Sequence, residues 1–147
     1  MRKGGTGMAD GFDLERFVEA QERVVEQVRS ELRAGRKRGH WMWFVFPQLR
    51  GLGQSENSRF YGIGSREEAA AYLRHPELGA RLVEWTRLVL AVPRRRSEEI
   101  FGEVDSLKFR SSMTLFAAVT VRERVFEEAL VRFFDGEGDE GTLDLLE

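Results

Sequence analysis

Apolar residues recur at helical spacing along most of this chain, and that periodicity is the strongest constraint on its fold. Between Leu14 and Leu32 they fall on one face of a helix with about 3.6 residues per turn. Similar stripes run from Leu78 to Leu90 and from Val125 to Phe133. No segment alternates polar and apolar residues as a half-buried strand would. The pattern predicts an all-α protein, a single-domain orthogonal bundle of about five to seven helices.

Polar residues, glycine and proline mark where these helices should begin and end. The residues expected to cap helix N-termini are Asp13, Ser65 (with Glu68), Ser97, Asp105, Thr120 (with Glu123) and Thr142. Gly35 and Pro93 should end helices. The helix from Asp105 to roughly Thr120 carries apolar residues around most of its circumference, which predicts a buried central helix. Residues 41–46 are too short and too uniformly apolar to distinguish helix from strand, and the glycine-rich segment 50–64 reads as a loop.

The composition places limits on function. A chain of 147 residues suits one domain, which we expect at 12–147 after a disordered tail at 1–11. The absence of cysteine excludes disulfides and thiolate chemistry, and the two histidines have no zinc-site spacing, so we expect neither a metal nor a cofactor. No apolar run has the length of a membrane span and the N-terminus does not resemble a signal peptide, which predicts a cytoplasmic protein.

Charge argues against one class of partner. The net charge of −2 offers no overall attraction for nucleic acid. The basic clusters Arg36–Arg38 and Arg94–Arg96 are therefore interpreted as solvated loops, balanced by acidic residues elsewhere. Homo-oligomerisation stays open.

The segment "HWMWFVFPQ" is the first candidate for a functional site. Phe44, Val45 and Phe46 are most simply core, and the whole run could be core. However, His40, Trp41, Trp43 and Gln48 combine aromatic faces with polar edges, which suits the wall of a ligand site.

The segment "DSLKFRSSMT" is the second candidate. Asp105, Lys108 and Ser111 (or Ser112) lie within about one and a half turns of an expected helix N-terminus, where backbone N–H groups favour anions. The alternative is structural: Asp105 as a cap, Lys108 extending to solvent and the serines packing against a neighbouring helix. Tyr61, in the glycine-rich loop, could belong to the core or to the rim of the same site.

The segments "HWMWFVFPQLRGLG", "YGIGSREEAAAYLRHPELGARL", "IFGEVDSLKFRSSMTLFAAV" and "TLDLL" together resemble the bacterial domain-of-unknown-function family 1810, which automatic annotation sometimes labels calpastatin-like. The resemblance extends from about Phe12 to Leu146. It implies the all-helical fold of a mycobacterial relative and implies no activity.

Two functions remain open. In the first, the chain binds a small anionic or nucleotide-like ligand in a pocket formed by His40, Trp41, Trp43, Gln48, Tyr61, Asp105, Lys108 and Ser111. If that site is catalytic, His40 or Asp105 would be the acid–base group and Lys108 the charge stabiliser. In the second, the Trp-rich segment is a docking patch for a partner protein.

Overall fold

A computed structural model describes residues 11–147, and every regular element within that range is a helix. The ten helices are α1 (Glu15–Glu22), α2 (Val25–Ala34), α3 (Met42–Val45), α4 (Glu56–Phe60), α5 (Arg66–Arg74), α6 (Leu78–Leu90), α7 (Ser97–Phe101), α8 (Glu103–Ala118), α9 (Val125–Phe134) and α10 (Glu140–Leu146). The all-α prediction is confirmed, but the predicted number of helices was too small.

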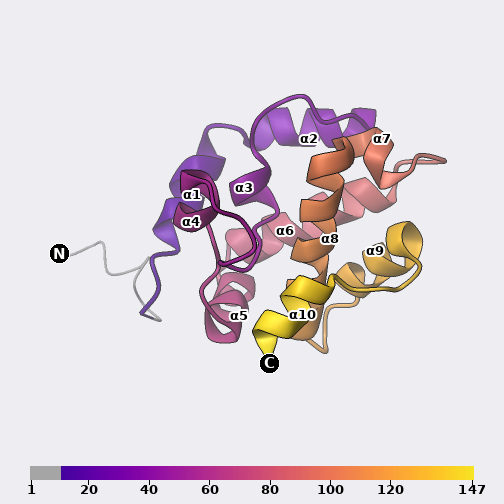
Figure 1. The fold of residues 1–147 in the computed structure, drawn as a ribbon. Helices are drawn as coiled ribbons and strands as arrows, with labels where there is room; N and C mark the ends of the chain where they lie inside the picture. Colours follow the sequence, from indigo (N-terminus) through magenta and orange to yellow (C-terminus); the bar gives the residue numbers. More distant parts are fainter. Residues whose placement is uncertain (1–10) are drawn as a thin grey trace.

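Helix α8 runs through the middle of the molecule (Figure 1). It contacts α5, α7, α9 and α10, while α6 packs against α2, α5 and α9, and α1 packs against α3. The predicted burial of this helix is confirmed from Phe109 to Phe116, where most residues are buried, but Leu107 nearer its start is 62% exposed. No helix among the described residues is long and apolar enough to cross a membrane.

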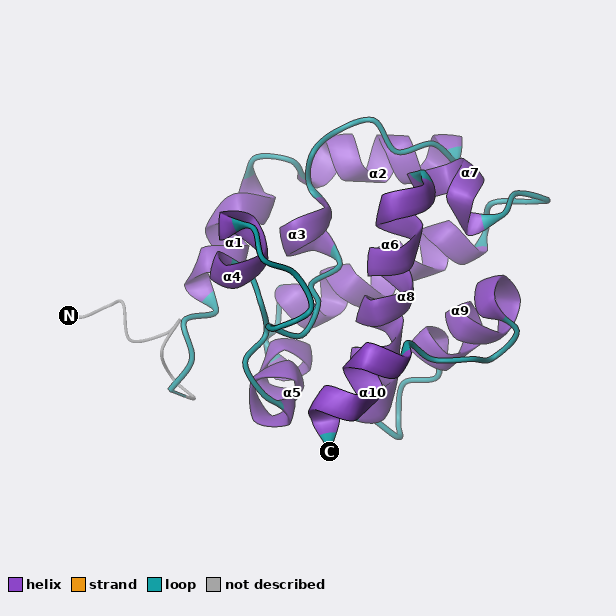
Figure 2. Ribbon diagram, viewed as in Figure 1, coloured by secondary structure: helices purple, strands orange, loops and turns teal. Residues whose placement is uncertain are grey.

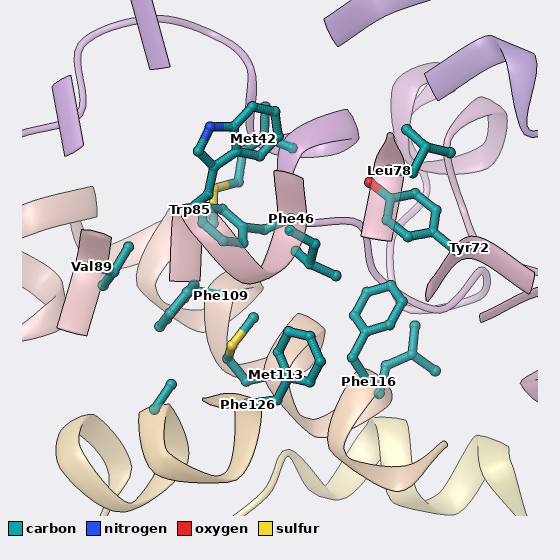
Figure 3. Close-up of a cluster of buried hydrophobic side chains, with 14 of the residues drawn as sticks. Met42, Phe46, Tyr72, Leu78, Trp85, Val89, Phe109, Met113, Phe116 and Phe126 are labelled. Atoms are coloured by element: carbon teal, nitrogen blue, oxygen red, sulfur yellow. The ribbon is translucent and has the colours of Figure 1, made fainter. Parts of the chain in front are cut away.

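The core forms around α8. Phe109, Met113 and Phe116 of α8 lie between Trp85 of α6 and Phe126 of α9 (Figure 3). All five side chains have no exposed surface, so each contributes about 1.5–3 kcal/mol of hydrophobic stabilisation. Packing of this density fixes the position of α8, and therefore of the polar residues in its first turns.

The additional helices lie in segments whose sequence pattern did not predict the observed structure. The apolar stripe from Leu14 to Leu32 was expected to form one helix, but it is interrupted at Arg23 and Val24 and forms α1 and α2. The segment expected to be a loop contains α4 (Figure 2), and Leu49 and Ile63 at its ends pair as an isolated parallel bridge. Residues 41–46, left undecided by the sequence, contain the short helix α3.

The expected N-caps were right at Ser65, whose hydroxyl accepts from the Glu68 N–H. They were wrong at Asp13, Ser97, Asp105 and Thr142, because Leu14, Arg96, Gly102 and Asp139 occupy those cap positions. Thr120 accepts from Glu123 as expected, but in the turn before α9. Gly35 ends α2 in the left-handed conformation, with φ of 71°. The predicted tail lies outside the described residues except for Gly11.

Candidate functional site

The loop between α2 and α3 is organised by one carboxylate. Glu31 Oε1 accepts from the backbone N–H groups of Arg38 and Gly39, at 2.7 and 2.9 Å, and from the indole N–H of Trp41 at 2.9 Å. Burial opposes ionisation of Glu31, but these hydrogen bonds and one from Gln27 outweigh it and lower its pKa to about 2. The loop backbone is therefore held around a permanent negative charge at neutral pH.

Two lysines from different parts of the chain share one aspartate. Lys37 Nζ, from the loop after α2, lies 2.8 Å from Asp105 Oδ2, and Lys108 Nζ lies 3.5 Å from Asp105 Oδ1. The Lys37 side chain is only 9% exposed. A backbone hydrogen bond from Lys37 N–H to the Ile100 carbonyl, at 2.7 Å, holds this loop against α7.

Each lysine also faces a tryptophan. Lys108 Nζ lies 3.5 Å from the centre of a Trp43 ring, and Lys37 Nζ lies 5.1 Å from that of Trp41. Both distances are within the range of a cation–π contact. Trp41 is 1% exposed and is part of the core, whereas Trp43 is half-buried. We call Lys37, Trp43, Asp105 and Lys108 the lysine cluster.

The structure brings Trp43, Asp105 and Lys108 together, and Trp41 faces Lys37 from the core. The contacts of His40, Tyr61, Ser111 and Gln48 do not join them to this group. His40 is exposed at the end of the loop. Tyr61 packs on the rings of Phe17 and Phe44, at 5.9 and 5.2 Å, and its contacts lie among the aromatic residues near α1.

Ser111 and Gln48 have local roles in the described structure. The Ser111 hydroxyl donates to the Leu107 carbonyl one turn earlier, so its one donor is used within α8. The Gln48 carbonyl accepts from the Ile63 N–H at 2.8 Å, which anchors the segment after α3. Neither observation links these residues to the lysine cluster.

Sequence reasoning missed Lys37 and Glu31. Lys37 lies between two arginines, so its charge was interpreted as part of a solvated loop, and Glu31 was not among the candidate residues. The relevant signal was spacing: Glu31 precedes a glycine that ends the helix, and a carboxylate there can accept from the backbone N–H groups of the loop that follows.

The described residues also form a groove that none of the lysine-cluster residues lines. This groove of about 950 Å³ lies between α5, α6 and the segment after α8, with an apolar floor that includes Leu73, Ala80, Val83 and Val119. None of the candidate site residues lines it. Among the described residues, no group of three or more histidine, aspartate or glutamate side chains could hold a metal ion.

The low pKa of Glu31 makes the stability of this loop depend on pH. A carboxylate with a depressed pKa stabilises the folded state above its unfolded value of 4.5, and this contribution is lost as the pH falls toward 2. We expect Glu31→Gln to lower the free energy of unfolding by about 1–3 kcal/mol at pH 7, and the difference from wild type to shrink between pH 4.5 and 2.

Urea unfolding at pH 7, 4.5 and 3 measures this difference. Glu26→Gln, in the same helix with a side chain 82% exposed, is the control and should change stability by less than about 0.5 kcal/mol. If the free energy of unfolding differed between Glu31→Gln and wild type by the same amount at all three pH values, the role assigned to the Glu31 carboxylate would be contradicted.

Comparison with known proteins places the chain among relatives. Residues 11–146 match the family model described as "Protein of unknown function (DUF1810)". A crystal structure of the conserved hypothetical protein Rv1873 from Mycobacterium tuberculosis is 58% identical and superposes with a TM-score of 0.91. That similarity covers 92% of this chain and 96% of the mycobacterial one. The comparison with curated proteins finds no match.

Proposed function

We propose that this chain, which belongs to the DUF1810 family, binds a small anionic ligand at the lysine cluster. One observation carries the proposal: two ammonium groups converge on a single carboxylate beside a half-buried indole. The two lysines and Asp105 sum to one positive charge, which is carried by partly buried side chains.

Lys108 retains donors for a ligand. An ammonium group has three N–H donors, and in the described structure Lys108 directs itself at one Asp105 oxygen and the face of Trp43. Its side chain is 20% exposed, so an anion can reach it from solvent. The first turn of α8, a 16-residue helix, adds unpaired backbone N–H groups and the positive end of the helix dipole.

These features favour a ligand with a phosphate or carboxylate group. Lys108 covers one face of Trp43, so the cation–π pair presents the ammonium as the main recognition element. A nucleotide-like ligand, with its phosphates at the lysines and its ring against exposed parts of Trp43, fits the same arrangement. Asp105 serves here to hold the lysines, and the contacts of the cluster support binding without assigning a reaction.

We expect adenosine diphosphate or pyrophosphate to bind wild-type protein, and Lys108→Gln to weaken that binding by about tenfold or more, equivalent to about 1.4 kcal/mol. The reason is loss of a charge-assisted contact that the remaining lysine cannot replace. Isothermal titration calorimetry measures the affinity, and quenching of tryptophan fluorescence reports on Trp43.

Arg110→Gln is the matched control, because it removes one positive charge from the same helix but at a side chain paired with Glu137. It should change the affinity by less than about threefold. A second variant should change the affinity in the opposite direction. Asp105→Asn makes the net charge of the cluster more positive and should tighten anion binding by several-fold. Equal affinities in wild type, Lys108→Gln and Asp105→Asn would refute the proposal.

A further inference from the structure

Positive charge is concentrated in two short stretches of this chain. Residues 32–40 and 91–97 contain seven lysine or arginine residues and no acidic one. The rest of the chain has 16 basic and 25 acidic residues, so the net charge of −2 conceals a strong asymmetry. The seven residues are Arg33, Arg36, Lys37, Arg38, Arg94, Arg95 and Arg96.

The fold places the two stretches side by side. The Lys37 N–H donates to the Ile100 carbonyl at 2.7 Å, which joins the loop after α2 to α7. A methyl group added at Gly35 would lie 2.9 Å from a Val92 carbon and 3.5 Å from Arg95 Cδ. Figure 1 shows the end of α2 beside α7, with the loop before α7 projecting from the same end of the molecule.

Most of these arginines form no ion pair. Arg33, Arg36, Arg38, Arg94 and Arg95 are exposed, and none forms an ion pair with another described residue. By contrast, Arg16, Arg29, Arg81 and Arg110 all pair with glutamates. Arg94 is further held with φ of 63°, a conformation that costs a non-glycine residue energy. We call these five residues the arginine surface.

We propose that the arginine surface binds the phosphate backbone of single-stranded nucleic acid. The proposal goes beyond the small-ligand site, because none of these five residues belongs to the lysine cluster. Arginine is suited to phosphate, since its planar guanidinium donates two parallel hydrogen bonds. Half-buried Trp43 belongs to the lysine cluster, which includes Lys37 from the same loop as Arg36 and Arg38, and it offers an aromatic edge for a base.

Two features favour a single nucleic acid strand over other polyanions. The exposed positions between the arginines are small or conformationally special, such as Ala34 and Pro93, and Val92 is buried. The surface therefore lacks the apolar anchors on which protein interfaces depend. It consists of two loops and a helix end, and this shape follows a flexible backbone more readily than it enters the major groove of a duplex.

Fluorescence anisotropy with a labelled oligouridylate of about 12 nucleotides tests the proposal in the full chain. We expect a Kd of about 1–100 µM at low salt and a steep loss of affinity with added salt, as release of counterions requires. The triple variant Arg36→Gln, Arg94→Gln, Arg95→Gln should bind at least about tenfold more weakly, with a salt slope reduced by about 2.

The matched control is the triple variant Arg23→Gln, Arg59→Gln, Arg122→Gln, which removes the same charge from other exposed positions. It should bind within about threefold of wild type. An equal loss in both triple variants, or no binding by wild type at low salt, would overturn the proposal. Competition by polyglutamate as effective as that by unlabelled oligonucleotide at equal charge would also overturn it, and would indicate an acidic polypeptide instead.

Wild type and the Lys108→Gln variant distinguish this inference from the small-ligand proposal. Lys108→Gln should lose binding of adenosine diphosphate while keeping oligonucleotide affinity within about threefold, because the arginine surface is intact. Oligonucleotide binding by a wild type that does not bind adenosine diphosphate would refute only the lysine-cluster proposal. The reverse result would refute only the arginine-surface proposal.

Discussion

Replacing Gly79 with alanine is expected to destabilise the protein by about 3 kcal/mol or more. Gly79 lies in the first turn of α6, where the end of α5 crosses close to it. A Cβ atom added at Gly79 would lie 2.1 Å from the Leu73 carbonyl oxygen, far inside contact distance. Because the obstacle is backbone, relief requires α5 and α6 to separate, and both helices pack on the core.

The expected loss of stability is opposite to the usual effect of replacing a helical glycine with alanine. Alanine is favoured over glycine in a helix by about 0.5–1 kcal/mol, so an unobstructed helical glycine gains from the change. Gly141→Ala, in α10, is the control: its nearest neighbour is the end of the Leu52 side chain at 3.2 Å, which can shift. Chemical denaturation measures both variants. A Gly79→Ala protein as stable as wild type would show that α5 and α6 do not approach as described.

Replacing Glu68 with alanine should cost about 3–5 kcal/mol, because it leaves a buried arginine without its counter-charge. The side chains of Arg16 and Glu68 are 7% and 6% exposed and meet at 2.8 Å. Arg16 also donates to the carbonyls of Phe60 and Gly62, at 2.8 and 3.0 Å. Glu68 accepts from the Gly64 N–H at 2.7 Å. Together they hold the segment between α4 and α5 against α1.

The double variant Arg16→Met, Glu68→Leu tests whether the unpaired buried charge causes this loss. It should recover a large part of the loss, because no buried charge remains unpaired. The exposed pair Arg124 and Glu127, 2.9 Å apart with side chains 72% and 58% exposed, is the control, and Glu127→Ala should cost less than about 1 kcal/mol. Similar losses at the buried and exposed pairs would contradict the assigned difference in burial.

Only part of the candidate site could be predicted. Some of its residues are neighbours in the sequence, whereas others meet only in the tertiary structure. Asp105 and Lys108 are three residues apart on one helix, so their proximity follows from helix geometry. Trp43 could be named from its aromatic neighbours, but its contact with Lys108 depends on how α3 packs beside α8. Lys37 was missed because its partner, Asp105, is 68 positions later in the chain and no local pattern links them.

The sequence by itself determined the helical class, the burial of α8 and the positions of Ser65 and Gly35 at helix ends. These depend on periodicity and on the hydrogen bonds of neighbouring residues, which act over a few positions. Only the tertiary structure decided that Lys37 and Lys108 share Asp105 and that the basic stretches 32–40 and 91–97 adjoin. Charge interactions act between groups close in space, and a summed net charge carries no information about where those groups lie.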